Sequence, residues 1–164
     1  MSIRLEYWRA APDEYRALMS LQTRLKAGID RRLFDLIFLR VSQINGCAFC
    51  IDSHASEMRK TDDSGRRLDA LVVWRDTPFF SAAERAALDW AERLTEIRNR
   101  GSLDAPYEAL RPHFSERQIA VLTFAITVMN AMNRVAIGFG RRPELDAASS
   151  PPAEVRAERN NETR

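Results

Sequence analysis

Apolar residues recur along this chain at intervals of three and four, the spacing that places side chains on one face of an α-helix. The pattern is clear over residues 14–27 and again over residues 31–42, and the second segment ends at the helix-breaking pair Asn45-Gly46. No stretch of useful length alternates between apolar and polar residues, as a half-buried strand would. The sequence therefore predicts an all-α fold.

Two capping boxes indicate where later helices begin. Ser81 is followed three residues on by Glu84, and Ser115 by Gln118, so each pair can satisfy backbone N–H groups at a helix N-terminus. Further helices are predicted over residues 47–60, 68–74 and 106–113.

The segment after Ser115 is apolar on nearly every side, and such a helix is usually buried by its own domain or by a subunit partner. Its apolar residues are Ile119, Val121, Leu122, Phe124, Ile126, Val128, Met129 and Met132. Asn130 and Asn133 lie among them, and because buried amides need hydrogen-bond partners, we expect these two residues to tie helices together.

Size and charge limit the possible classes of protein. A chain of 164 residues with a net charge of +2 fits one domain, and its interleaved charges indicate neither nucleic-acid nor membrane-surface binding. No targeting segment is evident, and no apolar stretch is expected to be long enough and uncharged enough to span a bilayer, so a cytoplasmic protein is expected. Residues 1–141 are predicted to form the helical domain, and residues 142–164, rich in Pro, Ala, Ser and charges, a disordered tail.

The chemically informative residues are Cys47, Cys50 and His54, which include both cysteines and one of the two histidines of the chain. On a helix, residues three and four apart share a face, so the two thiols and a proton acceptor are brought together. A free thiol with a pKa of about 8.5 is only slightly ionised at neutral pH, and a helix N-terminus or a nearby base favours the reactive thiolate. In the reducing cytosol, a CxxC pair is more often catalytic or metal-binding than structural.

Other interpretations of the two cysteines are possible. Free cysteines can pack as inert core residues. A zinc site could use Cys47, Cys50 and His54 with Asp35 or His113, although structural zinc usually needs a second well-spaced pair. Haem attachment is excluded because that motif requires a histidine directly after the second cysteine, where this chain has Ile51.

A longer string, RVSQINGCAFCIDSH over residues 40–54, resembles the signature of the AhpD-like alkylhydroperoxidase core within the carboxymuconolactone decarboxylase superfamily. The resemblance continues in WRDTPFF over 74–80, in the helix after Ser81 with Glu84, and in NAMNR over 130–134, and it covers roughly residues 3–139. It implies an antiparallel helical bundle of about six to seven helices that assembles into trimers or hexamers. The activity it implies is that of a thiol-dependent peroxidase in antioxidant defence.

The resemblance also assigns roles to residues. By the family pattern, Cys50 attacks the peroxide, Cys47 resolves the product into a disulfide, and His54 belongs to a proton relay. The family's relay glutamate corresponds to Asp35, an acid shorter by one methylene, and a histidine found between the cysteines of some members is replaced by Phe49. An external dithiol, either lipoyl-type or thioredoxin-like, would reopen the disulfide, and no bound cofactor or metal is needed.

Two other functions remain open at this level. The first is a non-enzymatic redox sensor or assembly protein, whose disulfide changes a partner contact without repeated turnover. The second is a decarboxylase-type, non-redox enzyme on the same scaffold, which would not depend on the dithiol.

Overall fold

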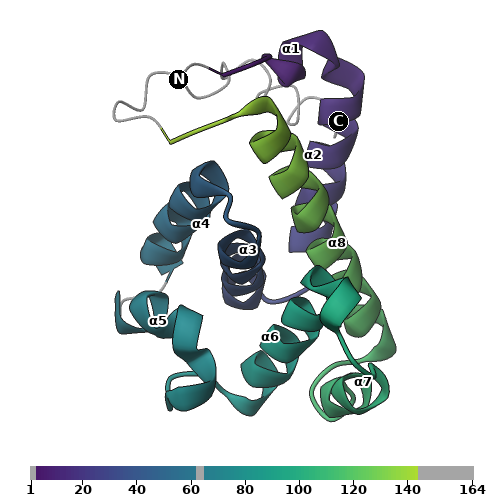
Figure 1. The fold of residues 1–164 in the computed structure, drawn as a ribbon. Helices are drawn as coiled ribbons and strands as arrows, with labels where there is room; N and C mark the ends of the chain where they lie inside the picture. Colours follow the sequence, from purple (N-terminus) through teal and green to yellow (C-terminus); the bar gives the residue numbers. More distant parts are fainter. Residues whose placement is uncertain (1–2, 62–64, 144–164) are drawn as a thin grey trace.

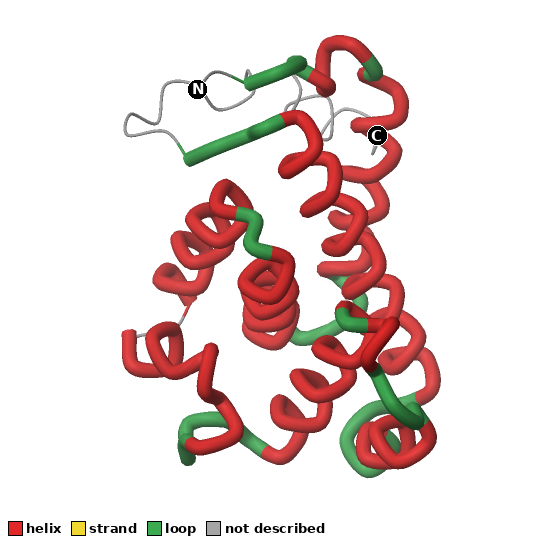
Figure 2. The backbone as a smooth tube through the Cα atoms, in the orientation of Figure 1, coloured by secondary structure: helices red, strands yellow, loops and turns green. Residues whose placement is uncertain are grey.

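The computed structural model describes residues 3–61 and 65–143, and this part of the chain contains eight α-helices, two short 3-10 helices and no strand. The all-α prediction is therefore confirmed (Figures 1 and 2). The α-helices are α1 (Tyr7–Ala10), α2 (Pro12–Lys26), α3 (Arg31–Asn45), α4 (Ala48–Thr61), α5 (Gly65–Ala70), α6 (Ala82–Thr95), α7 (Asp104–Leu110) and α8 (Glu116–Phe139). The 3-10 helices are η1 (Leu71–Asp76) and η2 (Ile97–Asn99).

Helix α3 forms the centre of the fold. It packs against α4, α6 and α8, while α2 runs antiparallel to α8 along the outside (Figure 1). Every residue from Leu33 to Leu39 is buried, which is possible because all but Asp35 are apolar. The start of α4, where the two cysteines lie, thus rests on the most buried element of the fold.

The helix ends follow the local sequence signals. Both capping boxes are confirmed: the Ser81 side chain accepts from the Glu84 N–H, and the Ser115 side chain from the Gln118 N–H. Helix α3 ends as predicted at Gly46, whose φ of 68° lies in the left-handed region that glycine adopts without strain. The end of α3 at Gly46 fixes the connection between α3 and α4, whereas the two capping boxes fix the starts of α6 and α8.

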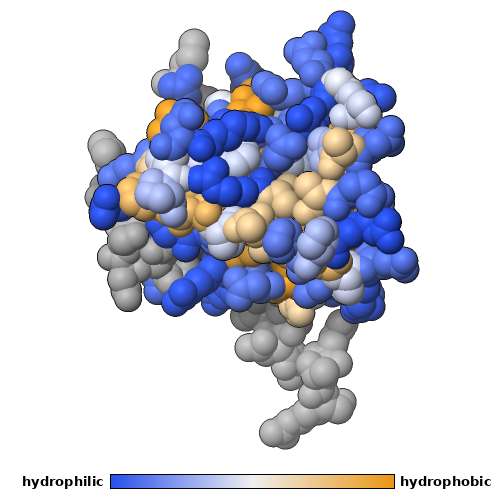
Figure 3. Space-filling model, turned by 90° about the horizontal axis from the view of Figure 1, so that it is seen from below, coloured by the Kyte–Doolittle hydropathy of each residue, from blue (hydrophilic) through white to orange (hydrophobic). Residues whose placement is uncertain are grey.

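Helix α8 is less completely buried than its sequence suggests. One face packs against α2, α3 and α6, whereas Phe124 and Ile137 are 60% and 45% exposed. The expectation of burial on most sides is thus met on one face only. Seen from below the orientation of Figure 1, the molecule also shows a band of apolar residues between hydrophilic ones (Figure 3).

We expected no stretch of this sequence to be long and apolar enough to span a bilayer, and that expectation was wrong. By its length and composition alone, helix α8 is able to do so, with a mean hydropathy of 1.5 in its most apolar window. Half of that window is buried inside the fold, so packing against neighbouring helices accounts for much of its apolar character.

Two smaller differences concern helices near the surface. The short helix α1 was not anticipated, because four residues are too few to show periodicity. The single helix expected over residues 68–74 is divided between α5 and η1, with a non-helical backbone at Val73. The predicted disordered tail falls almost wholly outside the described residues, so it stays a prediction together with the domain boundary at residue 141.

The loop before α1 lies against the end of α8 (Figure 2). The Arg4 N–H donates to the Phe139 carbonyl at 2.8 Å, and the Arg4 guanidinium donates to the carbonyls of Ile137 and Gly138. The Tyr7 ring stacks on Phe139 with 5.4 Å between centroids. A cation at the carboxyl end of a helix is favourable, so these contacts hold both ends of the helical fold together.

Candidate functional site

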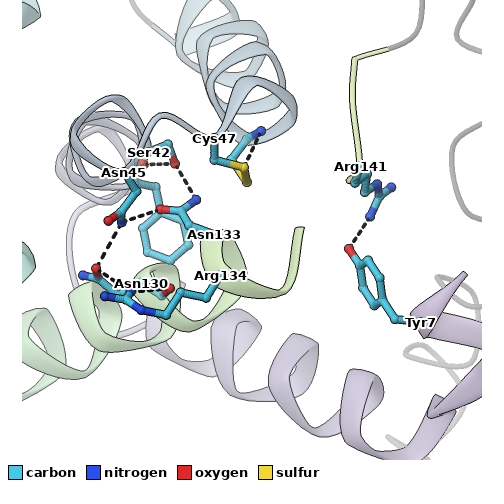
Figure 4. The surroundings of a disulfide bond; sticks show 10 residues. Tyr7, Ser42, Asn45, Cys47, Asn130, Asn133, Arg134 and Arg141 are labelled. Atoms are coloured by element: carbon cyan, nitrogen blue, oxygen red, sulfur yellow. Dashed lines mark hydrogen bonds between the residues drawn. A yellow bond between two sulfur atoms is a disulfide. The ribbon is translucent and has the colours of Figure 1, made fainter. Parts of the chain in front are cut away.

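Cys47 and Cys50 are joined by a disulfide at the first turn of α4, with 5.3 Å between their Cα atoms. Both are buried, with exposed fractions of 1% and 4%. The Cys50 N–H points at the Cys47 Sγ, 3.4 Å away, so this sulfur occupies the place of a helix-capping oxygen (Figure 4). The sulfur pair therefore lies in the positive field of a helix N-terminus.

The turn before the cysteines is fixed by backbone hydrogen bonds. The Cys47 N–H donates to the Ser42 carbonyl at 3.1 Å, and the Gly46 N–H donates to the Gln43 carbonyl at 3.2 Å. Both bonds satisfy carbonyls in the last turn of α3, in the manner of a Schellman motif. The end of α3 thereby determines where α4 and its sulfurs begin.

A network of buried and half-buried polar side chains supports this turn. The Asn45 amide donates to the Oδ1 atoms of Asn130 and Asn133 at 3.0 and 2.9 Å, and the Asn133 amide donates to the Ser42 Oγ at 3.2 Å (Figure 4). Asn130 also donates to the Thr95 Oγ1 at 3.0 Å, which adds α6 to the network. The two asparagines of α8 thus tie helices together, as expected.

His54 lies one turn beyond Cys50 on α4, with its ring edge-on to Phe38 at 5.2 Å between centroids. The pKa of His54 is lowered from 6.5 to about 4, first by burial and then by the charge of Lys26, against an opposing effect of Glu57. The imidazole is therefore neutral at pH 7 and has a nitrogen lone pair available to accept a proton.

Asp35 is buried on α3, but its ion-pair partners are two cations rather than His54. Its Oδ1 lies 3.4 Å from the Lys26 Nζ, and its Oδ2 lies 3.4 Å from the Arg31 Nε. Arg31 also pairs with Glu57 of α4 at 3.1 Å. The acid is thus held between α2 and α3, and its place in a relay with His54 stays a prediction.

Phe49, between the two cysteines, contacts Arg141, a residue that no sequence pattern singles out. The Arg141 guanidinium lies over the Phe49 ring at 3.7 Å from its centroid and over the Trp8 ring at 4.8 Å. Its Nη1 donates to the Tyr7 hydroxyl at 3.1 Å (Figure 4). No sequence motif links these positions, because they meet only when the segment before α2 folds onto the end of α8.

The zinc alternative has no support in the described part of the chain. No group of three or more His, Cys, Asp or Glu side chains in residues 3–61 and 65–143 is arranged to hold a metal ion. The two sulfurs are bonded to each other, and His113 is exposed beyond the end of α7.

Solved structures share this arrangement of helices. A protein of unknown function from Agrobacterium tumefaciens, described as a candidate antioxidant-defence protein AhpD, is 38% identical, with a TM-score of 0.84 over 88% of this chain and all of that one. A peroxidase-related protein with an alkylhydroperoxidase AhpD core from Ralstonia eutropha is 24% identical. It has a TM-score of 0.73 over 84% of this chain and 74% of that one, and it shows the fold alone.

Proteins similar in sequence point to the same family as the solved structures. The uncharacterized protein YdfG of Bacillus subtilis is 38% identical over 143 residues, which are 87% of this chain and 97% of that protein. The alkyl hydroperoxide reductase AhpD of Maricaulis maris is 58% identical over 45 residues, 27% of this chain and 26% of that protein. Residues 12–93 match the carboxymuconolactone decarboxylase family. The chain therefore belongs to the carboxymuconolactone decarboxylase family and has an AhpD-like core.

Proposed function

We propose that this protein is a thiol-dependent peroxidase that reduces hydroperoxides through Cys47 and Cys50. The observation that carries the proposal is the bonded pair of sulfurs at the N-terminus of α4, with a neutral histidine one turn further on. A dithiol that closes into a disulfide without moving its helix can be oxidised and reduced repeatedly.

Cys50 is the attacking residue in this scheme. Its thiolate sulfur attacks the terminal oxygen of the hydroperoxide, so that an S–O bond forms, the O–O bond breaks and an alcohol leaves. The Cys47 sulfur then attacks the resulting sulfenic acid, and water leaves as the disulfide forms. An external dithiol supplies two electrons and two protons to restore both thiols.

The surroundings of α4 favour each step. The helix N-terminus stabilises a thiolate at either cysteine through its dipole and its free N–H groups. His54, neutral in the oxidised protein, accepts the proton of the Cys50 thiol and returns it to the leaving alkoxide. A thiolate on the same face of α4 adds a negative charge that favours the protonated imidazole, so His54 becomes a stronger base in the reduced protein.

The partners and the location of the protein form part of the same proposal. The reductant is a lipoyl-type or thioredoxin-like dithiol, and the compartment is the cytoplasm, where such dithiols are kept reduced. The assembly is a trimer or hexamer. The exposed side chains of Phe124 and Ile137 on α8 support a contact between copies, since large apolar side chains at a surface favour burial by a partner. Asp35 completes the relay by way of a water molecule or a local shift.

Hydroperoxide consumption with dithiothreitol as reductant tests the proposal. Native protein and a Ser53→Ala control, altered at an exposed residue of α4, should turn over many equivalents of cumene hydroperoxide. Cys50→Ser should be inactive. Cys47→Ser, assayed without dithiothreitol, should consume one equivalent and stop with Cys50 as a sulfenic acid. Equal rates for Cys50→Ser and native protein would remove the dithiol from the chemistry.

The same experiment separates the other candidate functions. One equivalent consumed by native protein, with a disulfide formed but no turnover in the presence of the dithiol, would indicate a redox sensor. A decarboxylase-type enzyme would consume no hydroperoxide, and its own activity would survive the loss of both cysteines.

A further inference from the structure

The Arg141 guanidinium lies over two aromatic rings, and one of them belongs to Phe49, which stands between the two cysteines. The Phe49 and Trp8 ring centroids lie 3.7 and 4.8 Å from its central carbon, and the Tyr7 hydroxyl accepts from Nη1 at 3.1 Å. The Arg141 main chain is also fixed, because its N–H donates to the Ala136 carbonyl at 2.8 Å after the left-handed Gly140. The side chain therefore has a defined orientation before any ligand arrives.

Most of the N–H donors of this guanidinium have no acceptor within the described residues. Arginine carries five N–H donors, and within the described residues the Tyr7 hydroxyl is the one acceptor that Arg141 reaches. No carboxylate in the same part of the chain forms an ion pair with it, whereas nearby Arg9 pairs with Glu6 at 2.8 Å. Arg141 contacts the two rings through its guanidinium carbon, and its N–H groups are the part that can bind an anion.

We propose that Arg141 binds the carboxylate of a small organic acid whose other end reaches the dithiol. Phe49 lies in the first turn of α4 between the two cysteines, so a carboxylate paired with Arg141 is bound against the helical turn that carries both sulfurs. The planar fork of arginine matches a carboxylate with two parallel hydrogen bonds. The half-buried rings of Phe49 and Trp8 offer an apolar surface to the hydrocarbon body of such an acid.

This inference rests on the proposed peroxidase function and adds a preference among its reactants. Two reactants that visit the dithiol could carry the carboxylate: the hydroperoxide of an organic acid, or a dithiol acid that serves as reductant. Arg141 is then a residue that determines specificity by binding, and it takes no part in the electron transfer.

Two pairs of probes distinguish the sources. In the first, linoleic acid hydroperoxide is compared with its methyl ester, with dithiothreitol as reductant. In the second, dihydrolipoic acid is compared with dihydrolipoamide, with cumene hydroperoxide as oxidant. If the natural carboxylate is carried by the hydroperoxide, the first pair should show a preference for the acid; if it is carried by the reductant, the second pair should. The preference in kcat/KM should be about tenfold, which is the effect of one charge-assisted contact at a half-exposed site.

Substitution of Arg141 should remove that preference. Arg141→Met keeps a long apolar side chain against the rings and should lower kcat/KM for the acid to the value of its neutral counterpart. Arg141→Lys keeps the charge but not the fork and should retain part of the preference. Arg9→Met, altered at an exposed arginine of α1, is the matched control and should behave as native protein.

Binding of octanoate, followed by calorimetry, tests the site without turnover. Native protein and Arg9→Met should bind octanoate about tenfold more tightly than Arg141→Met does, and methyl octanoate should bind all three proteins equally. If native protein binds octanoate and its ester alike, or shows no preference for the acid in either kinetic pair, the inference about Arg141 is wrong. A protein that binds octanoate through Arg141 but turns over no hydroperoxide would instead refute the peroxidase function alone.

Discussion

Lowering the pH from 7 to 5 should destabilise the oxidised protein through one side chain, His54. Burial and the charge of Lys26 lower its pKa from 6.5 to about 4. As the pH falls below 6.5, His54 in the unfolded chain binds a proton that His54 in the folded chain does not accept until about pH 4. The stabilisation is thus fully present above pH 6.5 and is lost progressively as the pH falls towards 4.

The size of this effect follows from the same pair of values. One pKa unit corresponds to about 1.4 kcal/mol, so the complete effect is about 3 kcal/mol. At pH 7 almost none of it has been lost, and at pH 5 the loss is at most about 2 kcal/mol. Most carboxylates are still ionised at pH 5, so they add little to the difference over this interval.

Urea unfolding of the oxidised protein at pH 7 and pH 5, without reductant, measures the loss. His54→Gln removes the titrating group and should show almost no difference between the two values of pH. His113→Gln removes the other histidine of the chain, which is exposed, and should lose as much stability as native protein does. If His54→Gln is destabilised between pH 7 and pH 5 as strongly as native protein, the buried imidazole is not the cause.

Three further substitutions test the supports of the site. Asn133→Ala should lower the free energy of unfolding in urea by about 2 kcal/mol, because it removes the hydrogen bonds that Asn133 makes with Asn45 and with the Ser42 Oγ; a loss below 1 kcal/mol would contradict this. Gly46→Ala should cost about 1 kcal/mol by the same assay through backbone strain alone, since nothing lies within 4 Å of the added Cβ. Ser115→Ala should cost about 1 kcal/mol and lower Tm, and an unchanged Tm would mean that its capping bond adds nothing.

The sequence was sufficient for the parts of the fold that depend on local patterns. Helical spacing predicted the class, and the capping boxes at Ser81 and Ser115 located two helix starts. Spacing cannot show which of two apolar helices lies deeper. Helix α3 is the central one, although the segment after Ser115 is more uniformly apolar, because burial depends on how many neighbours surround a helix.

The candidate site, like the fold, was predictable only where it depends on local spacing. The spacing of Cys47 and Cys50 was enough to predict that the two sulfurs meet, and His54 follows Cys50 by one turn on α4; the catalytic roles of the three residues stay predictions. The surroundings of Asp35 were not predictable, since Lys26 comes from the preceding helix and its ion pair depends on how α2 meets α3. The position of Arg141 depends on a contact between residues far apart in the chain, for which no local pattern exists.

The hydrogen bond from Arg4 to Phe139 has a practical consequence for work with this protein. It brings the two ends of the helical fold to one place, beside Tyr7, Arg141 and thus Phe49. A tag or fluorescent protein fused directly before residue 3 or directly after residue 141 would therefore emerge close to Tyr7 and Arg141. A short peptide loop joining residues 3 and 141 would close the chain into a ring, and new ends could then be opened far from the site, for instance between α6 and α7.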